Sequence, residues 1–129
     1  MMQNRHCFNE RYMEIGKEYI LNMTVSQDET AEMIGSGGLP VYATPAMIGH
    51  MELAAFKLAE QYGHQTVGTK VNISHLRACR PGTGIKVTAV LTEADGRRLE
   101  YEVRVEDASG ILGEGTHQRY IIDPERFMA

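Results

Sequence analysis

The sequence predicts an α+β fold in which a curved antiparallel β-sheet wraps around one long central helix. Three observations lead to this prediction. Residues 43–62 have the composition of a long helix, residues 66–122 alternate between apolar and polar side chains, and mostly short turns divide that alternating region. Short connections make neighbouring strands antiparallel, and a helix that is apolar over most of its surface needs the sheet as a cover.

Length and composition narrow the class of protein. A chain of 129 residues predicts one domain, 1–129, with a single hydrophobic core. The net charge is −4 with acidic and basic residues interspersed, which argues against a nucleic-acid-binding protein. No apolar run is long enough to cross a bilayer, and MMQNRHCFNERY at the start has no apolar signal core. We therefore expect a cytoplasmic protein with neither nucleic-acid nor membrane partners.

Cysteine and histidine spacing gives no sign of a metal site. Cys7 and Cys79 form neither a CxxC motif nor a zinc spacing, so free thiols are expected in a reducing compartment. His6, His50 and His64 form no i,i+4 pair on a helix. We predict that the protein binds no metal and needs no cofactor.

The first third of the chain should form a strand followed by a short helix. Residues 17–26, KEYILNMTVS, place apolar side chains at every second position, which is typical of a strand. SQDE at 26–29 matches a capping box, so a short helix should follow and end near Gly35. GSGGLP at 35–40 predicts a flexible loop that could act as a lid.

The long helix is expected next, with four strands after it. Thr44 matches an N-cap residue with Pro45 at the first helical position, and Gly63 is the expected C-terminal stop. Residues 66–78 should form a strand whose helix-facing side carries Val67, Thr69, Val71, Ile73 and His75. The remaining strands are separated by turn sequences at 81–84 (PGTG), 94–97 (ADGR) and 107–110 (DASG).

Glu52 is centred on an apolar stripe of the expected helix. At about 100° per residue, every position within about 60° of Glu52 is apolar, whereas polar residues lie opposite. No Lys or Arg occupies i±3 or i±4, and burying an unpaired carboxylate is costly. Such a group can be a general base or a nucleophile. The alternatives are a core Glu bound to a backbone group or water, or a dimer-contact Glu. The stripe consists of Pro45, Ile48, Gly49, Ala55, Phe56 and Ala59, opposite His50, Lys57 and Gln61.

Three further residues are candidates for chemistry. His75 ends the helix-facing side of its strand, where an imidazole can move a proton or can simply be a satisfied core residue. Gly68 could allow a close backbone approach to a ligand, or it could mark a bulge. Thr44 could combine capping with a place at the positive end of the helix. Thr44 and Glu52 are separated by about 12 Å of helix rise, so either the helix starts late or a second subunit completes the site.

The order of elements and several motifs resemble the fluoroacetyl-CoA thioesterase-like family of the hotdog-fold thioesterase superfamily. The resemblance covers roughly residues 15–125. It is carried by ATPAMIGHME (43–52), GTKVNISH (68–75), RPGTGIKVTAVL (80–91), GRRLEYEV (96–103) and GTHQR (115–119). The segment AEMIGSGGLPVY (31–42) is Gly-rich and lacks the aromatic character associated with fluoroacetyl selectivity.

This resemblance implies an acyl-CoA thioesterase that cleaves a small acyl-CoA to free acid and coenzyme A. The family's catalytic Thr, Glu and His correspond to Thr44, Glu52 and His75, and its glycine near the thioester oxygen corresponds to Gly68. The resemblance also implies a homodimer with sites at the interface, which could pair further into a tetramer. Two alternatives remain open: a non-catalytic acyl-CoA-binding protein, and an enoyl-CoA hydratase of the same fold.

Overall fold

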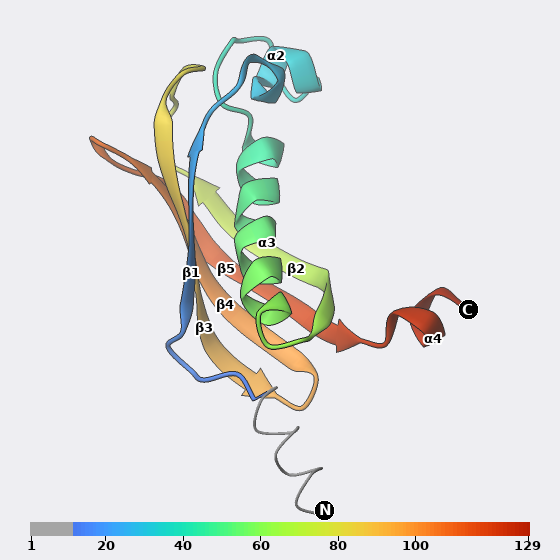
Figure 1. Cartoon of the computed structure of the whole chain (residues 1–129). Coiled ribbons are helices and arrows are strands. Elements are labelled where there is room, and N and C mark those ends of the chain that lie inside the picture. Colours follow the sequence, from blue (N-terminus) through green and yellow to red (C-terminus); the bar gives the residue numbers. More distant parts are fainter. Residues whose placement is uncertain (1–11) are drawn as a thin grey trace, which may run out of the picture.

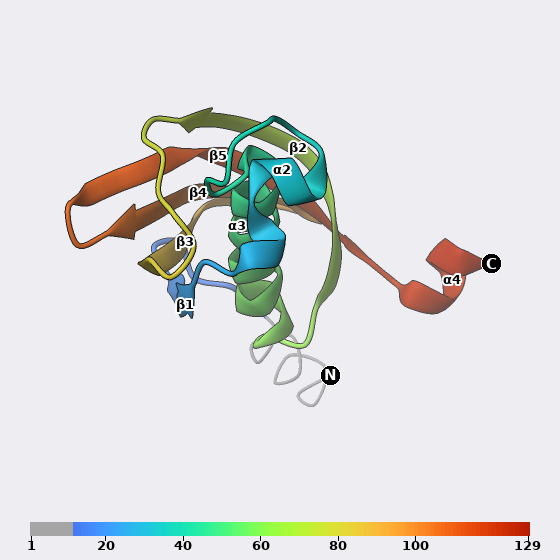
Figure 2. The same ribbon diagram turned by 90° about the horizontal axis from the view of Figure 1, so that it is seen from above.

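The computed structural model describes residues 12–129, which form a five-stranded antiparallel sheet and one long helix. The strand order is β1-β3-β4-β5-β2, so β1 and β2 are the two edges. The helix α3 lies against one face of the sheet, and the strands curve around it (Figures 1 and 2). This confirms the predicted α+β architecture. The strands are β1 (Glu18–Thr24), β2 (Gln65–His75), β3 (Gly84–Asp95), β4 (Arg98–Asp107) and β5 (Gly110–Ile122), and the long helix is α3 (Thr44–Glu60).

The segment between β1 and α3 folds over the N-terminal end of the long helix (Figures 1 and 2). It contains a 3-10 turn, η1 (Gln27–Glu29), and a short helix, α2 (Ala31–Ile34). The capping interaction expected from SQDE is present, because the Glu29 carboxylate accepts the Ser26 N–H at 2.9 Å. Gly35 ends α2 with φ at 94°, a left-handed conformation that favours glycine.

The core lies between α3 and the sheet. Alternate residues of β3 and β4 point toward the helix and are almost fully buried, as their period of two predicts. Exclusion of these apolar side chains from water is the main stabilisation of such a domain. The buried set includes Met47, Met51, Ala54 and Leu58 from α3, Val87, Ala89 and Leu91 from β3, and Leu99, Tyr101, Val103 and Val105 from β4.

The sheet covers only one side of α3, and this overturns in part the expectation that the stripe around Glu52 is buried: Ala55 and Ala59 are fully buried, but the rest of the stripe is not. Pro45 and Gly49 are exposed, and the Glu52 side chain is 41% exposed. His50, expected on the polar side, is buried instead. The reason is geometric: a single sheet layer contacts one face of a helix, and here it covers the face with Met47, Met51 and Leu58.

A β-bulge also changes the predicted face of β2. The register against β5 shifts between Gly68 and Lys70, so one residue is unpaired there. Before the bulge Thr66, rather than Val67, is the buried residue, whereas Ile73 packs against the core after it. An extra residue reverses the alternation of side chains, which a strict period of two cannot anticipate.

The C-terminal end carries an element that the sequence did not indicate. α4 (Pro124–Met128) begins after Asp123, whose carboxylate accepts the Glu125 N–H, and it projects away from the sheet (Figure 1). Among the described residues, no helix has the length and apolar character needed to cross a membrane.

Candidate active site

Thr44 and His75 meet at the N-terminal end of α3. Thr44 is the first residue of α3 and His75 is the last residue of β2, and Thr44 Oγ1 lies 2.7 Å from His75 Nδ1. Both line a cavity of about 340 Å³ whose walls also include Tyr42, Leu76 and Arg77. Two residues separated by 31 positions are thus brought into a direct hydrogen bond beside a cavity.

The hydroxyl of Thr44 does not cap the helix, contrary to the sequence prediction. Ala43 is the N-cap residue, and Thr44 and Pro45 are already helical. The Thr44 side chain is therefore free to bond to His75. A hydroxyl at the helix N-terminus lies near the positive end of the helix dipole, where developing negative charge is favoured.

The environment of His75 favours a neutral imidazole. Burial lowers the pKa of His75, and a hydrogen bond with the backbone of Arg77 opposes this only in part. His75 Nε2 is buried and has no hydrogen-bond partner within residues 12–129. An unpaired buried nitrogen is costly, so this atom is well suited to receive a bound ligand or a group from another subunit.

Glu52 lies two turns further along α3, beside Gly68 of β2. A Cβ atom built on Gly68 would lie 2.8 Å from Glu52 Oε2, which is closer than real Cβ atoms approach. Glycine therefore lets the strand and the carboxylate lie side by side in this position, and a larger residue would displace the carboxylate. Gly68 also adjoins the bulge, as one of the two interpretations of the sequence expected, while its approach to a ligand stays a prediction.

Arg119 of β5 supplies the positive charge near Glu52 that the helix itself lacks. Its Nη1 lies 3.9 Å from Glu52 Oε2, and its side chain is 8% exposed. The guanidinium donates to Thr66 through Nε at 2.8 Å and Nη2 at 3.1 Å, and lies 5.8 Å from the centroid of the Phe56 ring. Burial lowers the pKa of Arg119, while the charge of Glu52 is among the influences that oppose this.

His117 completes this cluster and its proton can be assigned. Arg119 Nη1 lies 3.1 Å from His117 Nε2, and a guanidinium can only donate, so Nε2 accepts. The proton is then on Nδ1, which donates to the Lys70 carbonyl at 2.8 Å. Burial lowers the pKa of His117, consistent with a neutral ring. His117 and Arg119 were not singled out from the sequence as site residues, and the only signal for them was the GTHQR motif.

The four candidate residues form two separate groups. Thr44 contacts His75, and Glu52 adjoins Gly68, but α3 is continuous from Thr44 to Glu60. The separation of eight positions between Thr44 and Glu52 corresponds to about 12 Å of helix rise. Of the two explanations left open by the sequence, a late start of the helix is therefore wrong.

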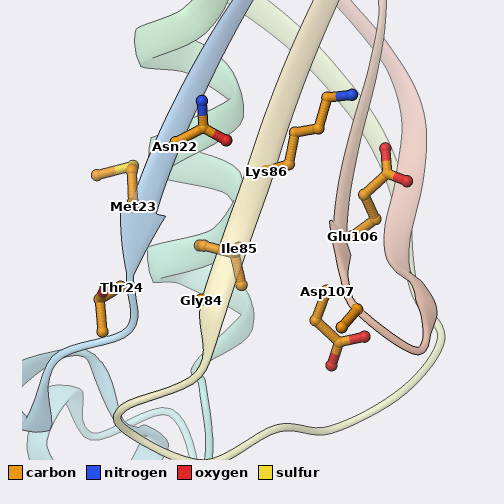
Figure 3. Close-up of a pocket in the computed structure, with 9 residues that line it drawn as sticks. Asn22, Met23, Thr24, Gly84, Ile85, Lys86, Glu106 and Asp107 are labelled. Atoms are coloured by element: carbon orange, nitrogen blue, oxygen red, sulfur yellow. The ribbon is translucent and has the colours of Figure 1, made fainter.

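A larger hollow of about 530 Å³ lies elsewhere, along the ends of β1, β3 and β4 (Figure 3). Its lining includes Asn22, Lys86 and Glu106 but no histidine or cysteine, and Asp107 at its rim is bound by Arg77. Glu106 is likewise bound, by Arg104 Nε at 3.0 Å, so both carboxylates of this hollow are held by arginine and neither is paired with a nucleophile. The chemistry favours the smaller cavity beside Thr44 and His75.

Cysteine and metal chemistry find no support in the described part of the chain. Cys79 is a free thiol, and burial raises its pKa, which disfavours the reactive thiolate. Cys7 and His6 lie outside the described residues. Within residues 12–129, no three His, Cys, Asp or Glu side chains are grouped so that they could hold a metal ion.

Comparisons with known proteins agree with this fold. Residues 25–125 match the family described as FlK, fluoroacetyl-CoA-specific thioesterase. The fluoroacetyl-CoA thioesterase of Streptantibioticus cattleyicolor is 38% identical over 92 residues, which are 69% of this chain and 66% of that protein. The match thus spans just under two thirds of the length of that relative.

Solved structures extend the similarity over most of the chain. A mutant of FlK in complex with fluoroacetate and CoA superposes with a TM-score of 0.84 at 31% identity, covering 89% of this chain and 99% of that one. A hot-dog-like protein from Thermanaerovibrio acidaminovorans superposes with a TM-score of 0.82 at 18% identity, covering 94% and 91% of the two chains. The fold is therefore the hotdog fold.

Proposed function

The chain belongs to the fluoroacetyl-CoA-specific thioesterase family, a family of thioester hydrolases, and from that premise we propose that it hydrolyses a small acyl-CoA to the free acid and coenzyme A. The observation that carries the proposal is the Thr44–His75 hydrogen bond at a cavity, with a carboxylate on the same helix. The solved complex of FlK with fluoroacetate and CoA supports an acyl-CoA as the substrate.

In the proposed reaction, water adds to the thioester carbonyl and the carbon–sulfur bond breaks. Glu52 acts as the general base that takes a proton from water, or as the nucleophile that attacks first and is then released by water. The hydrogen-bonded Thr44 and His75 polarise the carbonyl or orient the water. The Gly68 N–H helps to hold the oxyanion, and the departing thiolate takes up the proton released by water.

We further propose that each site is completed across a homodimer. Thr44 and Glu52 are too far apart along one unbroken helix to act on the same carbonyl. The outer side of α3 exposes Pro45, Gly49 and Leu53, and within residues 12–129 β2 is an edge strand with one side unpaired. A second copy laid along this side would cover apolar surface and a free strand edge while it brings Glu52 toward the partner's Thr44–His75 pair.

Thiol release from acetyl-, propionyl- and butyryl-CoA tests the reaction. We expect turnover by the wild type and a loss of kcat of about 100-fold or more in Glu52→Gln, which keeps the shape of the side chain but removes the base. Glu60→Gln is the matched control, because Glu60 is an exposed carboxylate at the end of the same helix. Equal activity of wild type and Glu52→Gln would show that the assigned mechanism is wrong.

The same samples distinguish the two alternative functions. Tight binding of acetyl-CoA by calorimetry with no turnover would identify an acyl-CoA-binding protein. Loss of the enoyl absorbance of crotonyl-CoA without thiol release would identify a hydratase. Under our proposal, thiol is released and the enoyl absorbance does not fall faster than hydrolysis accounts for.

A further inference from the structure

A network of hydrogen-bonded polar side chains lies next to the Thr44–His75 pair, on the side of the Tyr42 ring. Tyr42 Oη lies 2.5 Å from His50 Nδ1, and His50 Nε2 lies 2.8 Å from Glu29 Oε2. Tyr42 is 1% exposed and His50 is 9% exposed. We call these three residues the Glu29–His50–Tyr42 network. Glu29 lies in η1, His50 lies in α3, and Tyr42 lies in the loop before α3.

The connectivity is that of a carboxylate, an imidazole and a hydroxyl, but Tyr42 cannot be a nucleophile. In a hydrolytic triad the hydroxyl must reach the substrate, and the Tyr42 side chain is almost wholly buried. Burial also raises the pKa of Tyr42, so the phenol stays protonated and donates to His50 Nδ1. His50 then donates from Nε2 to Glu29, and each of the three groups has a partner.

The ring of Tyr42, rather than its hydroxyl, contacts the candidate site. The centroids of the Tyr42 and His75 rings are 6.3 Å apart at an interplanar angle of 76°, an edge-to-face arrangement. Tyr42 lines the same cavity as Thr44 and His75. The Tyr42 hydroxyl is hydrogen-bonded to His50 and the Tyr42 backbone N–H to the Cys79 carbonyl, so the ring is fixed at both ends against His75.

Glu29 also holds the backbone that leads into Thr44. Its carbonyl accepts the Ala43 N–H at 2.9 Å, while its carboxylate accepts the Ser26 N–H and the His50 Nε2–H. The neighbouring Tyr42 N–H donates to the Cys79 carbonyl at 2.8 Å. The pKa of Glu29 is lowered: burial opposes this, but the Ser26 N–H and His50 outweigh it, so an ionised acceptor is kept in place.

We propose that Glu29, His50 and Tyr42 are positioning residues that fix the Tyr42 ring against His75 and fix the entry of the chain into α3 at Thr44. This inference rests on the proposed thioesterase function, in which the Thr44–His75 geometry matters. Small displacements of reacting groups are costly to rate, so loosening the network lowers kcat more than it raises KM.

Tyr42→Phe tests the network, because it removes only the hydroxyl and leaves the ring. We expect kcat to fall about tenfold with KM changed less than about twofold. Tyr62→Phe is the matched control: Tyr62 is a half-buried tyrosine just beyond the opposite end of α3, and its variant should keep wild-type kcat. An unchanged kcat in Tyr42→Phe overturns the proposal.

A double variant separates positioning from simple stability. Tyr42→Phe alone leaves His50 Nδ1 buried without a partner, whereas Tyr42→Phe with His50→Leu replaces both groups by apolar ones and should recover the melting temperature. Glu29 keeps its Ser26 hydrogen bond and some contact with water. We expect kcat to stay low although the fold is restored. Recovery of wild-type kcat in the double variant shows a merely structural role.

Amide hydrogen exchange supplies a readout that needs no turnover. In Tyr42→Phe, exchange of the Ala43 N–H should accelerate about tenfold, whereas the Met47 N–H, bonded to the Ala43 carbonyl at 3.0 Å inside α3, should change little. Equal protection of Ala43 in both proteins overturns the proposal. If the wild type hydrolyses no acyl-CoA, the proposed function fails, but this measurement still decides whether the network holds the entry to α3.

Discussion

The two halves of the proposed site are built in different ways. The Thr44–His75 half is a direct 2.7 Å hydrogen bond backed by a buried polar network. The Glu52 half is open: its carboxylate is 41% exposed, and its nearest cation, Arg119, is 3.9 Å away and occupied with Thr66 and His117. Residues of the same chain hold the Thr44–His75 pair in place, whereas the exposed Glu52 carboxylate can still accept a hydrogen bond from a substrate, a water molecule or another subunit. Under the dimer proposal, the reactive geometry forms only when two chains meet.

The largest effect should come from mixing two inactive variants. Thr44→Ala and Glu52→Gln each disable one half. If sites form across a dimer, half of the dimers after subunit exchange are mixed, and each mixed dimer has one intact site. Activity should then rise from near zero to about a quarter of the wild-type value.

Thiol release before and after unfolding and refolding the mixture is the measurement. Thr44→Ala is expected to fold normally, since the N-cap of α3 is Ala43 and the hydroxyl caps nothing. No recovery of activity, in a sample that light scattering shows to be dimeric, would mean that both halves belong to one chain.

A smaller effect is expected where β2 approaches Glu52. Gly68→Ala places a methyl group within 2.8 Å of Glu52 Oε2 and 3.1 Å of Arg119 Nη1, so the carboxylate must move. We expect kcat/KM to fall about tenfold while the Thr44–His75 half stays intact. Gly84→Ala is the control, because apart from its chain neighbours no atom of the described residues lies within 4 Å of the position of its added Cβ. A Gly68→Ala enzyme with wild-type kinetics would show that the position of Glu52 beside Gly68 does not matter for the reaction.

The smallest effect is a pH dependence of stability that involves both halves. Burial lowers the pKa of His75 and of His117, so the unfolded chain takes up protons at a higher pH than the folded one. The free energy of unfolding should be highest above the ordinary histidine pKa of about 6.5, where both histidines are neutral in either state. It should decrease as the pH falls below that value, because the unfolded chain then binds more protons.

Urea unfolding between pH 8 and pH 5.5 measures this dependence. The decrease should be shallower in His117→Asn, which removes one of the two groups, than in the wild type. The pKa values of Glu29 and Asp107 are also lowered, but these carboxylates change the stability only at lower pH, where carboxyl groups titrate. They therefore do not affect the comparison between pH 8 and pH 5.5. A stability that is flat across this range in the wild type would contradict the assignment of neutral, buried imidazoles.

Local sequence patterns were sufficient for the order of the five strands and α3, but not for α4. Alternation and turn glycines predicted β3, β4 and β5, because a strand that is buried on one face needs an apolar residue at every second position. The hairpin at Gly96, with φ at 62°, follows from the same short-range rules. The apolar stripe pointed to Glu52, and the motif resemblance implied roles for Thr44, Glu52, His75 and Gly68.

Tertiary structure alone decided which face of α3 is buried and which residues meet. Helical periodicity shows that α3 has apolar flanks on several sides, but the side that the sheet covers depends on how the sheet packs against the helix, so Glu52 lies at the edge and His50 lies inside. The charge of Arg119 near Glu52 and the Glu29–His50–Tyr42 network join residues far apart in sequence, and no local pattern encodes such a meeting. The sequence determines which side chains each segment can bury. Only the packing of the sheet against the helix determines which polar groups are removed from water and which partners they hydrogen-bond to.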